Sequence, residues 1–313
     1  MDQKCGVGQA GDAYERHADA YDRARPSYPE AAVAWLLEGA RRTPGTTDVL
    51  ELGAGTGKLT EQLAARGCSV TATDPSEAML SRLTRRAPRA RALAGTAEQI
   101  PVRPRSVDLV VAAQAFHWFD TDRTLHEVAR VLRPGGRLAF LWNSRDERIP
   151  WVKRLGRIMG TAHQADDPTD MIDGTGMFES VERTSFRFWQ PLSRESLRDL
   201  VVSRSHVAVM SDFERERVLR KVDDLYAEYG RGADGMLLPY VTTVCRATVL
   251  PWALPADPAP DPAERAVPPV GDVDERQPVE GHTQLGRGHQ TDQELAEHGE
   301  SPVLRGCSIG PGH

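Results

Sequence analysis

The 313-residue sequence lacks several features that would assign it to common protein classes. No apolar run approaches the roughly 20 residues of a membrane-spanning helix, and the N-terminus has no apolar core of the signal-peptide kind. The four cysteines are scattered, without the paired spacing of zinc or redox motifs. We therefore expect a cytoplasmic protein with free thiols, no membrane association and no bound metal.

An excess of positive charge is also absent. Lys and Arg number 39 against 45 Asp and Glu, which gives a net charge of -6 and a pI of about 5.9. Nucleic-acid binding surfaces are basic, so we expect no nucleic-acid partner. Hydrophobic residues make up 40% of the chain, as in ordinary globular proteins. The oligomeric state stays open.

Short apolar segments alternate with amphipathic ones through the first half of the chain. We expect strands at 48–52, 69–73, 89–94, 107–112 and 137–142, and helices at 29–42, 57–66, 77–86 and 122–132. Strands that alternate with helices at this spacing are typical of parallel βαβ units. The sequence therefore predicts an α/β fold with a doubly wound sheet.

The second half has a looser pattern. It predicts helices at 151–160, 193–205 and 213–229, and strands at 184–190 and 240–250. No full crossover pattern links the last two strands, which favours an antiparallel edge pair. The segment 251–313 is rich in proline and acidic residues and has no aromatic residue after Trp252, so we expect a disordered tail.

A glycine-rich run, Gly53-Ala54-Gly55-Thr56-Gly57-Lys58, joins the strand at 48–52 to the next helix. Such a turn is a typical nucleotide cradle. A Walker loop needs glycine at 52 and a hydroxyl at 59, and both positions are Leu. A dinucleotide fingerprint needs its third glycine at 58, which is Lys, so a nicotinamide-dependent oxidoreductase is disfavoured.

Five ordered blocks carry a family resemblance. They are Glu51–Gly57, Thr73–Ser76 with Met79, Ala94–Pro101, Ser106–Val110 and Val131–Leu138. With them the chain resembles the class I S-adenosylmethionine (SAM) dependent methyltransferases of small-molecule, methyltransferase type 11-like kind, over residues 13 to 250.

That resemblance implies a Rossmann-like sheet of seven strands, mostly parallel, with an antiparallel edge strand. It implies one domain over 1–250, with a lid at 13–42, a SAM-binding core at 48–142, and a cap with far-edge strands at 143–250.

The cofactor implied is SAM, which has no pyrophosphate. Glycines at 53, 55 and 57 allow the backbone to pass close to its methionine part and ribose. The resemblance implies that Glu51 helps to hold the methionine ammonium; the alternative is a solvated carboxylate at a strand end. Asp74 ends the second strand, where a carboxylate accepts ribose hydroxyls; the alternative is a helix N-cap only.

Further cofactor contacts are expected beyond the second strand. Met79 is a candidate to lie on the adenine, although a helical Met is often core. Ala97 and Glu98 occupy the block that, by resemblance, gives adenine a backbone contact. Gln114 follows the fourth strand at the cofactor's edge, or it caps exposed backbone there.

The N-terminal segment resembles the lid of small-molecule methyltransferases related to the trans-aconitate and ubiquinone-pathway types. Tyr21, Arg25 and Tyr28 are candidates to close over SAM and contact its carboxylate. The alternative is an ordinary helix start bounded by proline.

His117 lies at the carboxyl end of the fourth strand, where open α/β sheets place ligands. It is the candidate general base or substrate partner, and a structural imidazole is the alternative. The sequence predicts methyl transfer by in-line displacement to a small-molecule acceptor. The rival hypotheses are a SAM-binding protein of this fold with other chemistry, or a regulator without turnover.

Overall fold

The computed structural model describes residues 22, 25–40, 45–160, 169–204, 207, 209–230 and 235–255, all within one unit that spans residues 1–259. Most of the predicted tail, from 256 onward, lies outside the described residues. Residues 251–255 are folded: Pro251–Ala253 form the short helix η2, and the Trp252 indole donates a hydrogen bond to the Gly176 carbonyl at 3.1 Å. In the described part of the chain, no helix is both long and apolar enough to cross a membrane.

The core of the fold is a seven-stranded mixed sheet, which confirms the predicted class. In spatial order its strands are β3 (Arg91–Ala94), β2 (Ser69–Asp74), β1 (Asp48–Leu52), β4 (Val107–Ala113), β5 (Leu132–Arg145), β7 (Met236–Thr248) and β6 (Glu182–Leu192). The first five are parallel, and β7 is antiparallel to both its neighbours. The antiparallel strand thus lies one place inside the edge, and β6 forms the edge itself.

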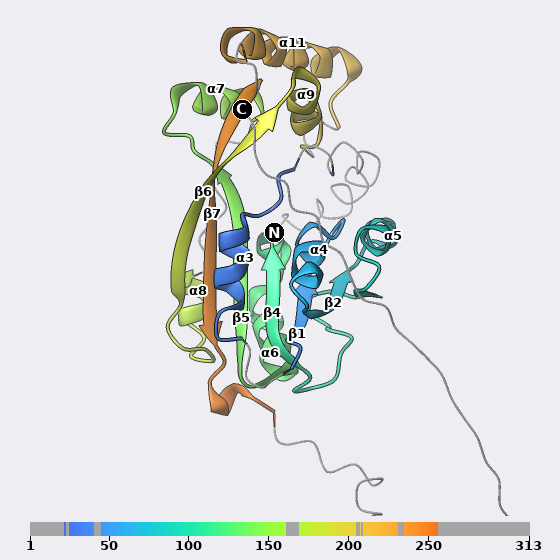
Figure 1. Ribbon diagram of the computed structural model, residues 1–313, viewed down its shortest axis with the longest axis vertical. Coiled ribbons are helices and arrows are strands. Elements are labelled where there is room, and N and C mark those ends of the chain that lie inside the picture. The colour runs from blue at the N-terminus through green and yellow to red at the C-terminus, as the bar shows by residue number, and fades with distance from the viewer. Residues whose placement is uncertain are drawn as a thin grey trace, which may run out of the picture. The chain divides into compact units, whose positions relative to one another are not determined.

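Helices cover both faces of this sheet (Figure 1). One face packs against α3 (Glu30–Leu37), α4 (Lys58–Ala65) and α5 (Glu77–Arg86), and the other packs against α6 (Thr121–Val131). The apolar side chains of β1 and β4 alternate between the two cores, as the period of two along a strand requires. Leu50 and Val110 face α6, whereas Val49 and Leu109 face α3 and α4.

Residues 133–136, which lie between the helix predicted at 122–132 and the strand predicted at 137–142, fall inside the bounds of β5. Val107 pairs with Leu132, and Leu109 pairs with Arg137, so β5 carries extra residues between these two pairs. Gly135 has a φ of +71° at this bulge, a conformation that glycine adopts without strain. The strand resumes at Arg137, where the sequence predicted its start.

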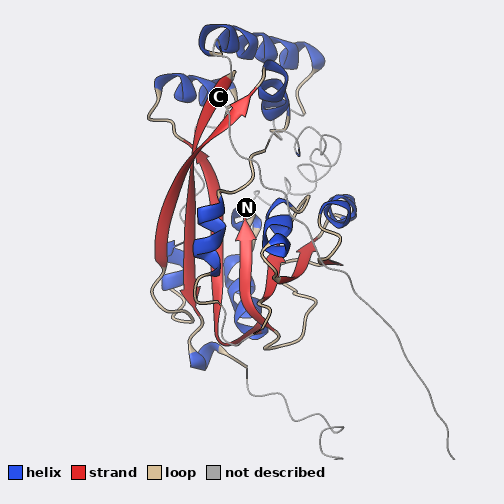
Figure 2. Cartoon of the chain, in the orientation of Figure 1, coloured by secondary structure: helices blue, strands red, loops and turns tan. Residues whose placement is uncertain are grey.

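Strands β5, β6 and β7 extend beyond the other four and carry a cap (Figures 1 and 2). The cap helices are α7 (Pro150–Ile158), α9 (Arg194–Val202) and α11 (Asp212–Tyr229). They share a second hydrophobic core with the strand ends, built on side chains such as Leu155, Leu200, Val222 and Leu238. The short helices α8 (Thr169–Asp173) and η1 (Phe116–Trp118) were not predicted.

Candidate functional site

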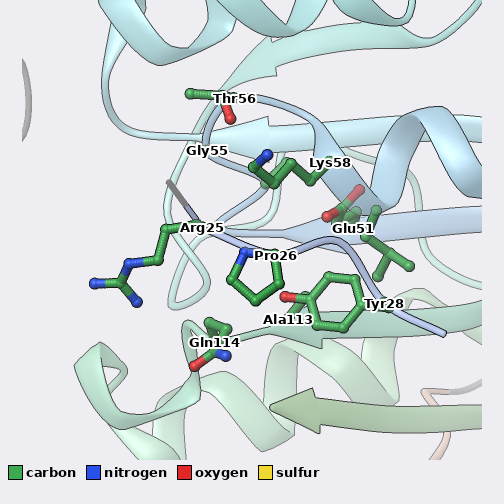
Figure 3. Close-up of a pocket in the computed structure, with 12 residues that line it drawn as sticks. Arg25, Pro26, Tyr28, Glu51, Gly55, Thr56, Lys58, Ala113 and Gln114 are labelled. Carbon is green, nitrogen blue, oxygen red and sulfur yellow. The ribbon is translucent and has the colours of Figure 1, made fainter. Parts of the chain in front are cut away.

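A pocket lies at the carboxyl ends of β1 and β4, next to the glycine-rich loop (Figure 3). It encloses a cavity of about 70 Å³. Its lining residues are Arg25, Pro26, Tyr28, Glu51, Gly53, Ala54, Gly55, Thr56, Lys58, Leu59, Ala113 and Gln114. Six of the predicted site residues therefore meet here: Arg25, Tyr28, Glu51, Gly53, Gly55 and Gln114.

The glycine loop has the backbone conformation that the sequence implied. Gly53, Gly55 and Gly57 all have positive φ, at +62°, +55° and +83°. A Cβ on Gly53 would lie 2.7 Å from the Cβ of Ala115, whereas one on Gly55 would meet nothing within 4 Å. The loop is therefore packed tightly at Gly53 and has open space beside Gly55, where a ligand can approach the backbone.

Glu51 is a buried carboxyl on the wall of this cavity, with only 1% of the residue exposed. Burial raises its pKa to about 8; the hydrogen bond from Thr60 Oγ1, at 2.6 Å, acts against this shift, and the nearby charge of Asp74 adds to it. At neutral pH the carboxyl is mostly protonated, and a cation in the cavity would favour its ionised form. The alternative of a solvated carboxylate is wrong.

Asp74 holds the glycine loop to the end of β2. The Gly55 N–H donates to its Oδ2 at 2.8 Å, and the Ser76 N–H donates to its Oδ1 at 2.9 Å. Burial raises the pKa of Asp74, and these two backbone hydrogen bonds oppose the shift. The N-cap of α5 is Ser76, whose hydroxyl accepts from the Met79 N–H, so Asp74 is not a helix cap. Each oxygen of the Asp74 carboxylate has a further lone pair, with which it can accept another hydrogen bond.

An ionic cluster that the sequence analysis missed ties Asp22 to the loop. Asp22 pairs with Arg86 at 2.5 Å and lies 3.9 Å from the Lys58 ammonium, and it accepts a 2.5 Å hydrogen bond from the Thr56 hydroxyl. Burial lowers the pKa of Lys58, although the charge of Asp22 opposes this shift. Only Lys58 gave a sequence signal, because it follows the glycine run directly.

The predicted lid residues are placed in part. Tyr21 lies outside the described residues. Tyr28 is buried, and its backbone exchanges two hydrogen bonds with the Gln62 amide on α4, at 3.2 and 2.7 Å. Arg25 lines the cavity, and its charge reaches His117. The segment 25–28 is therefore anchored over the pocket at Tyr28.

Gln114 lies where β4 ends and lines the same cavity. Its φ of +59° is in the left-handed region, which costs a residue other than glycine roughly 1–3 kcal/mol and is typical of functional sites. Its side-chain amide donates to the Asn143 carbonyl at 3.2 Å. The sequence predicted the residue but not its strained backbone.

His117 lies three residues further, on η1, and is exposed on one side. Its ring is 4.9 Å from that of Trp118. Packing on its other side lowers its pKa, and so does the positive charge of Arg25. The imidazole is therefore mostly neutral at pH 7, as a general base must be. It is not part of the cavity lining.

Three other candidates lie away from the cavity. Met79 and Ala97 are buried, at 7% and 4% exposure, and Ala97 belongs to the core that packs against α6. Glu98 accepts a hydrogen bond from the Asp120 N–H at the start of α6. Their adenine contacts stay predictions.

Comparison with known proteins identifies the family. A family model described as a methyltransferase domain matches residues 50–140. An uncharacterised methyltransferase of Mycobacterium tuberculosis is 46% identical over 232 residues, which cover 74% of this chain and 93% of the relative. An uncharacterised methyltransferase-like protein of Schizosaccharomyces pombe is 34% identical over 213 residues, 66% of this chain and 82% of that protein.

Solved structures agree with this result. A candidate type II methyltransferase of Anaeromyxobacter dehalogenans aligns with a TM-score of 0.51 and 25% identity, over 74% of this chain and 99% of that one. The strand order, the glycine loop after β1 and the relatives together assign the fold and the reaction class. The chain belongs to the class I SAM-dependent methyltransferases, and SAM is its methyl donor.

Proposed function

We propose that this enzyme methylates a small-molecule acceptor in the cytoplasm. The observation that supports this is a second, open cleft of about 410 Å³, which shares Arg25, Pro26 and Tyr28 with the cavity at the glycine loop. Small-molecule sites typically have volumes of roughly 300–1,000 Å³. The cofactor side and the acceptor side are then separated by one short segment of chain.

The residues at the loop fit SAM. The buried Glu51 carboxyl suits the methionine ammonium, the open space beside Gly55 admits the ligand, and Asp74 has acceptor capacity for the ribose hydroxyls. The cavity of about 70 Å³ is smaller than the whole cofactor needs. Segment 25–28 forms part of its wall, together with the glycine loop and the end of β4.

When bound, SAM would supply an electrophilic methyl group on a sulfonium, with a neutral thioether as the leaving group. The protein's part is to orient the two partners and to exclude water. Gln114 follows the end of β4 directly and lines the cavity, which suits a positioning role. His117 takes the proton of an acceptor that has one to lose.

The test is a turnover assay with SAM and a cell metabolite extract, in which mass spectrometry identifies products heavier by one methylene. Calorimetry first establishes that the protein binds SAM and its product S-adenosylhomocysteine. In a His117→Ala variant we expect unchanged SAM binding and reduced turnover. Equal turnover in that variant would remove His117 from the mechanism. Absence of any methylated small molecule, despite SAM binding, would refute the proposed acceptor class.

A further inference from the structure

Above the cofactor pocket, the three long strands align a row of side chains on one face of the sheet. Arg145 on β5 pairs with Tyr240 on β7, which pairs with Phe188 on β6. Directly paired residues point to the same face, and the Phe188 and Tyr240 rings stack at 5.3 Å with 16° between their planes. Four residues further along β5 and β7, Leu141 and Val244 pair on the same face and pack on the α3 side. The row therefore lies on the same face as Glu51, further toward the cap.

The hydroxyl at the centre of this row is unusual. Tyr240 is only 4% exposed, and its hydroxyl has no hydrogen-bond partner within the described residues. Burying a hydroxyl without a partner is unfavourable, and such groups are rare in native proteins unless a ligand or water uses them.

The positive charges of three arginines act on the Tyr240 hydroxyl. Burial raises the pKa of Tyr240, and the charges of Arg145, Arg204 and Arg25 act to lower it. Arg145 lies on β5, Arg204 lies two residues after α9, and Arg25 lies in the N-terminal segment. Arg145 also donates to Glu147 at 3.2 Å, but a guanidinium carries five N–H donors. No carboxylate in the described part of the chain contributes to the shift at this hydroxyl.

Arg25 connects this cluster to the catalytic side. It lines both the cofactor cavity and the open cleft, which Phe188, Trp189 and Gln190 on β6 also line. Its charge acts on His117 as well as on Tyr240. The lining of the cleft thus combines aromatic residues with arginine, and Trp189 is 60% exposed.

We propose that the methyl acceptor is an anionic small molecule, whose carboxylate or phosphate group is bound by Arg145, Arg25 and the Tyr240 hydroxyl. The apolar part of the acceptor then lies against the aromatic residues of the cleft, and its reacting atom points toward Gln114 and the glycine loop. Arginine suits both oxyanions because its planar donors match them in pairs. This inference rests on the proposed function, since it assigns the acceptor to the same site.

The test is calorimetry on the full chain saturated with S-adenosylhomocysteine. Three probes of similar shape are titrated: benzoate, phenyl phosphate and the neutral benzyl alcohol. We expect one or both anions to bind more tightly than the alcohol, and the comparison of benzoate with phenyl phosphate distinguishes carboxylate from phosphate. Equal binding of all three probes, or no binding of either anion, would overturn the inference.

Two variants locate the anion. Tyr240→Phe keeps the ring stack and removes only the hydroxyl, and Arg145→Gln removes one charge. A hydrogen bond to a charged group contributes enough that we expect anion affinity to fall roughly 10- to 100-fold in each. Arg187→Gln is the matched control, because Arg187 is exposed on β6 and points to the opposite face; its anion affinity should not change.

The outcomes separate the two proposals. If S-adenosylhomocysteine does not bind, the proposed function itself fails. If it binds, and anion affinity is the same in Tyr240→Phe and Arg145→Gln as in the wild type, only the anion site is refuted. If Arg145→Gln does not fold, as judged by thermal melting, Tyr240→Phe decides the question.

Discussion

Replacing Glu51 with glutamine should stabilise the free protein, and more so as the pH rises. Burial raises the pKa of Glu51 to about 8 from an ordinary value of 4.5. Below pH 4.5 the carboxyl is protonated whether the chain is folded or not. Between pH 4.5 and 8 the unfolded chain releases this proton while the folded protein keeps it, so the free energy of unfolding falls.

The size of the effect follows from that pKa difference. Across this range the free energy of unfolding falls by about 1.4 kcal/mol for each pH unit. Between pH 5 and 7.5 the wild type therefore loses about 3 kcal/mol of stability through Glu51. Glutamine does not titrate, and its side-chain oxygen still accepts the hydrogen bond from Thr60 Oγ1 that Glu51 accepts at 2.6 Å. For a domain of this size, 1 kcal/mol shifts the melting temperature by roughly 2–4 °C. The gap between Glu51→Gln and wild type should therefore grow by about 10 °C.

Thermal melting of both proteins, without SAM, at half-unit pH steps measures this gap. The control is Glu61→Gln on α4, where the carboxylate is 57% exposed and lies 3.5 Å from the Arg86 guanidinium; it shows what removing a solvent-exposed glutamate does to the melting temperature. A gap for Glu51→Gln that stays constant from pH 5 to 7.5 would show that Glu51 is already ionised in the free protein. That result would refute both the assigned protonation state and the idea that SAM binding drives its ionisation.

Three further predictions concern the loop and its supports. Asp74→Asn should weaken SAM binding by at least tenfold, about 1.4 kcal/mol, because the amide cannot accept at both positions as the carboxylate does; calorimetry measures this. Gln114→Gly should raise stability by about 1 kcal/mol, because glycine adopts positive φ without strain, yet should lower turnover, and melting and kinetic assays check the two effects. Arg86→Gln should destabilise the protein by about 1–3 kcal/mol, since Asp22 would lose its ion pair with Arg86 and keep only its contacts to Thr56 and Lys58; chemical denaturation with a matched Arg85→Gln control measures the loss.

The sequence predicted the sheet and the glycine loop because their signals are local. A strand, three glycines at alternate positions and a helix start lie within ten residues, and the backbone φ of each glycine agrees with the expected turn. Glu51 was predicted at the site for its position, but not its burial. Whether a carboxyl at a strand end is solvated depends on α4 packing over it, which the local pattern does not encode.

The ionic cluster and the cap were beyond sequence reasoning for a different reason. Asp22 and Arg86 are 64 residues apart, and no local pattern links the two positions. The strands predicted at 137–142 and 184–190 are shorter than β5 and β6, and the one predicted at 240–250 begins four residues after the start of β7 and ends two residues after its end. The cap ends of the three strands were missed because they pair only with each other and build a separate core with the cap helices. The row at Tyr240 follows from that pairing register, which the sequence of each strand does not reveal alone.

Glu51 and Tyr240 pose the same physical problem at two ends of one sheet face. Each is a buried polar group that destabilises the free protein, and the burial of each becomes favourable once its ligand binds. The ligand is a cation at the Glu51 carboxyl and an anion at the Tyr240 hydroxyl, which the arginines surround with positive charge. Tyr240→Phe should therefore raise the stability of the free protein by about 1 kcal/mol. No described contact joins the two residues, so the gains of Glu51→Gln and Tyr240→Phe should add within about 0.5 kcal/mol in the double variant. If Glu51→Gln loses SAM binding, Tyr240→Phe loses anion binding, and both variants are more stable than the wild type, then the wild type keeps these two buried groups for function at the expense of stability. If Tyr240→Phe is less stable than the wild type, the Tyr240 hydroxyl already has a hydrogen-bond partner in the free protein.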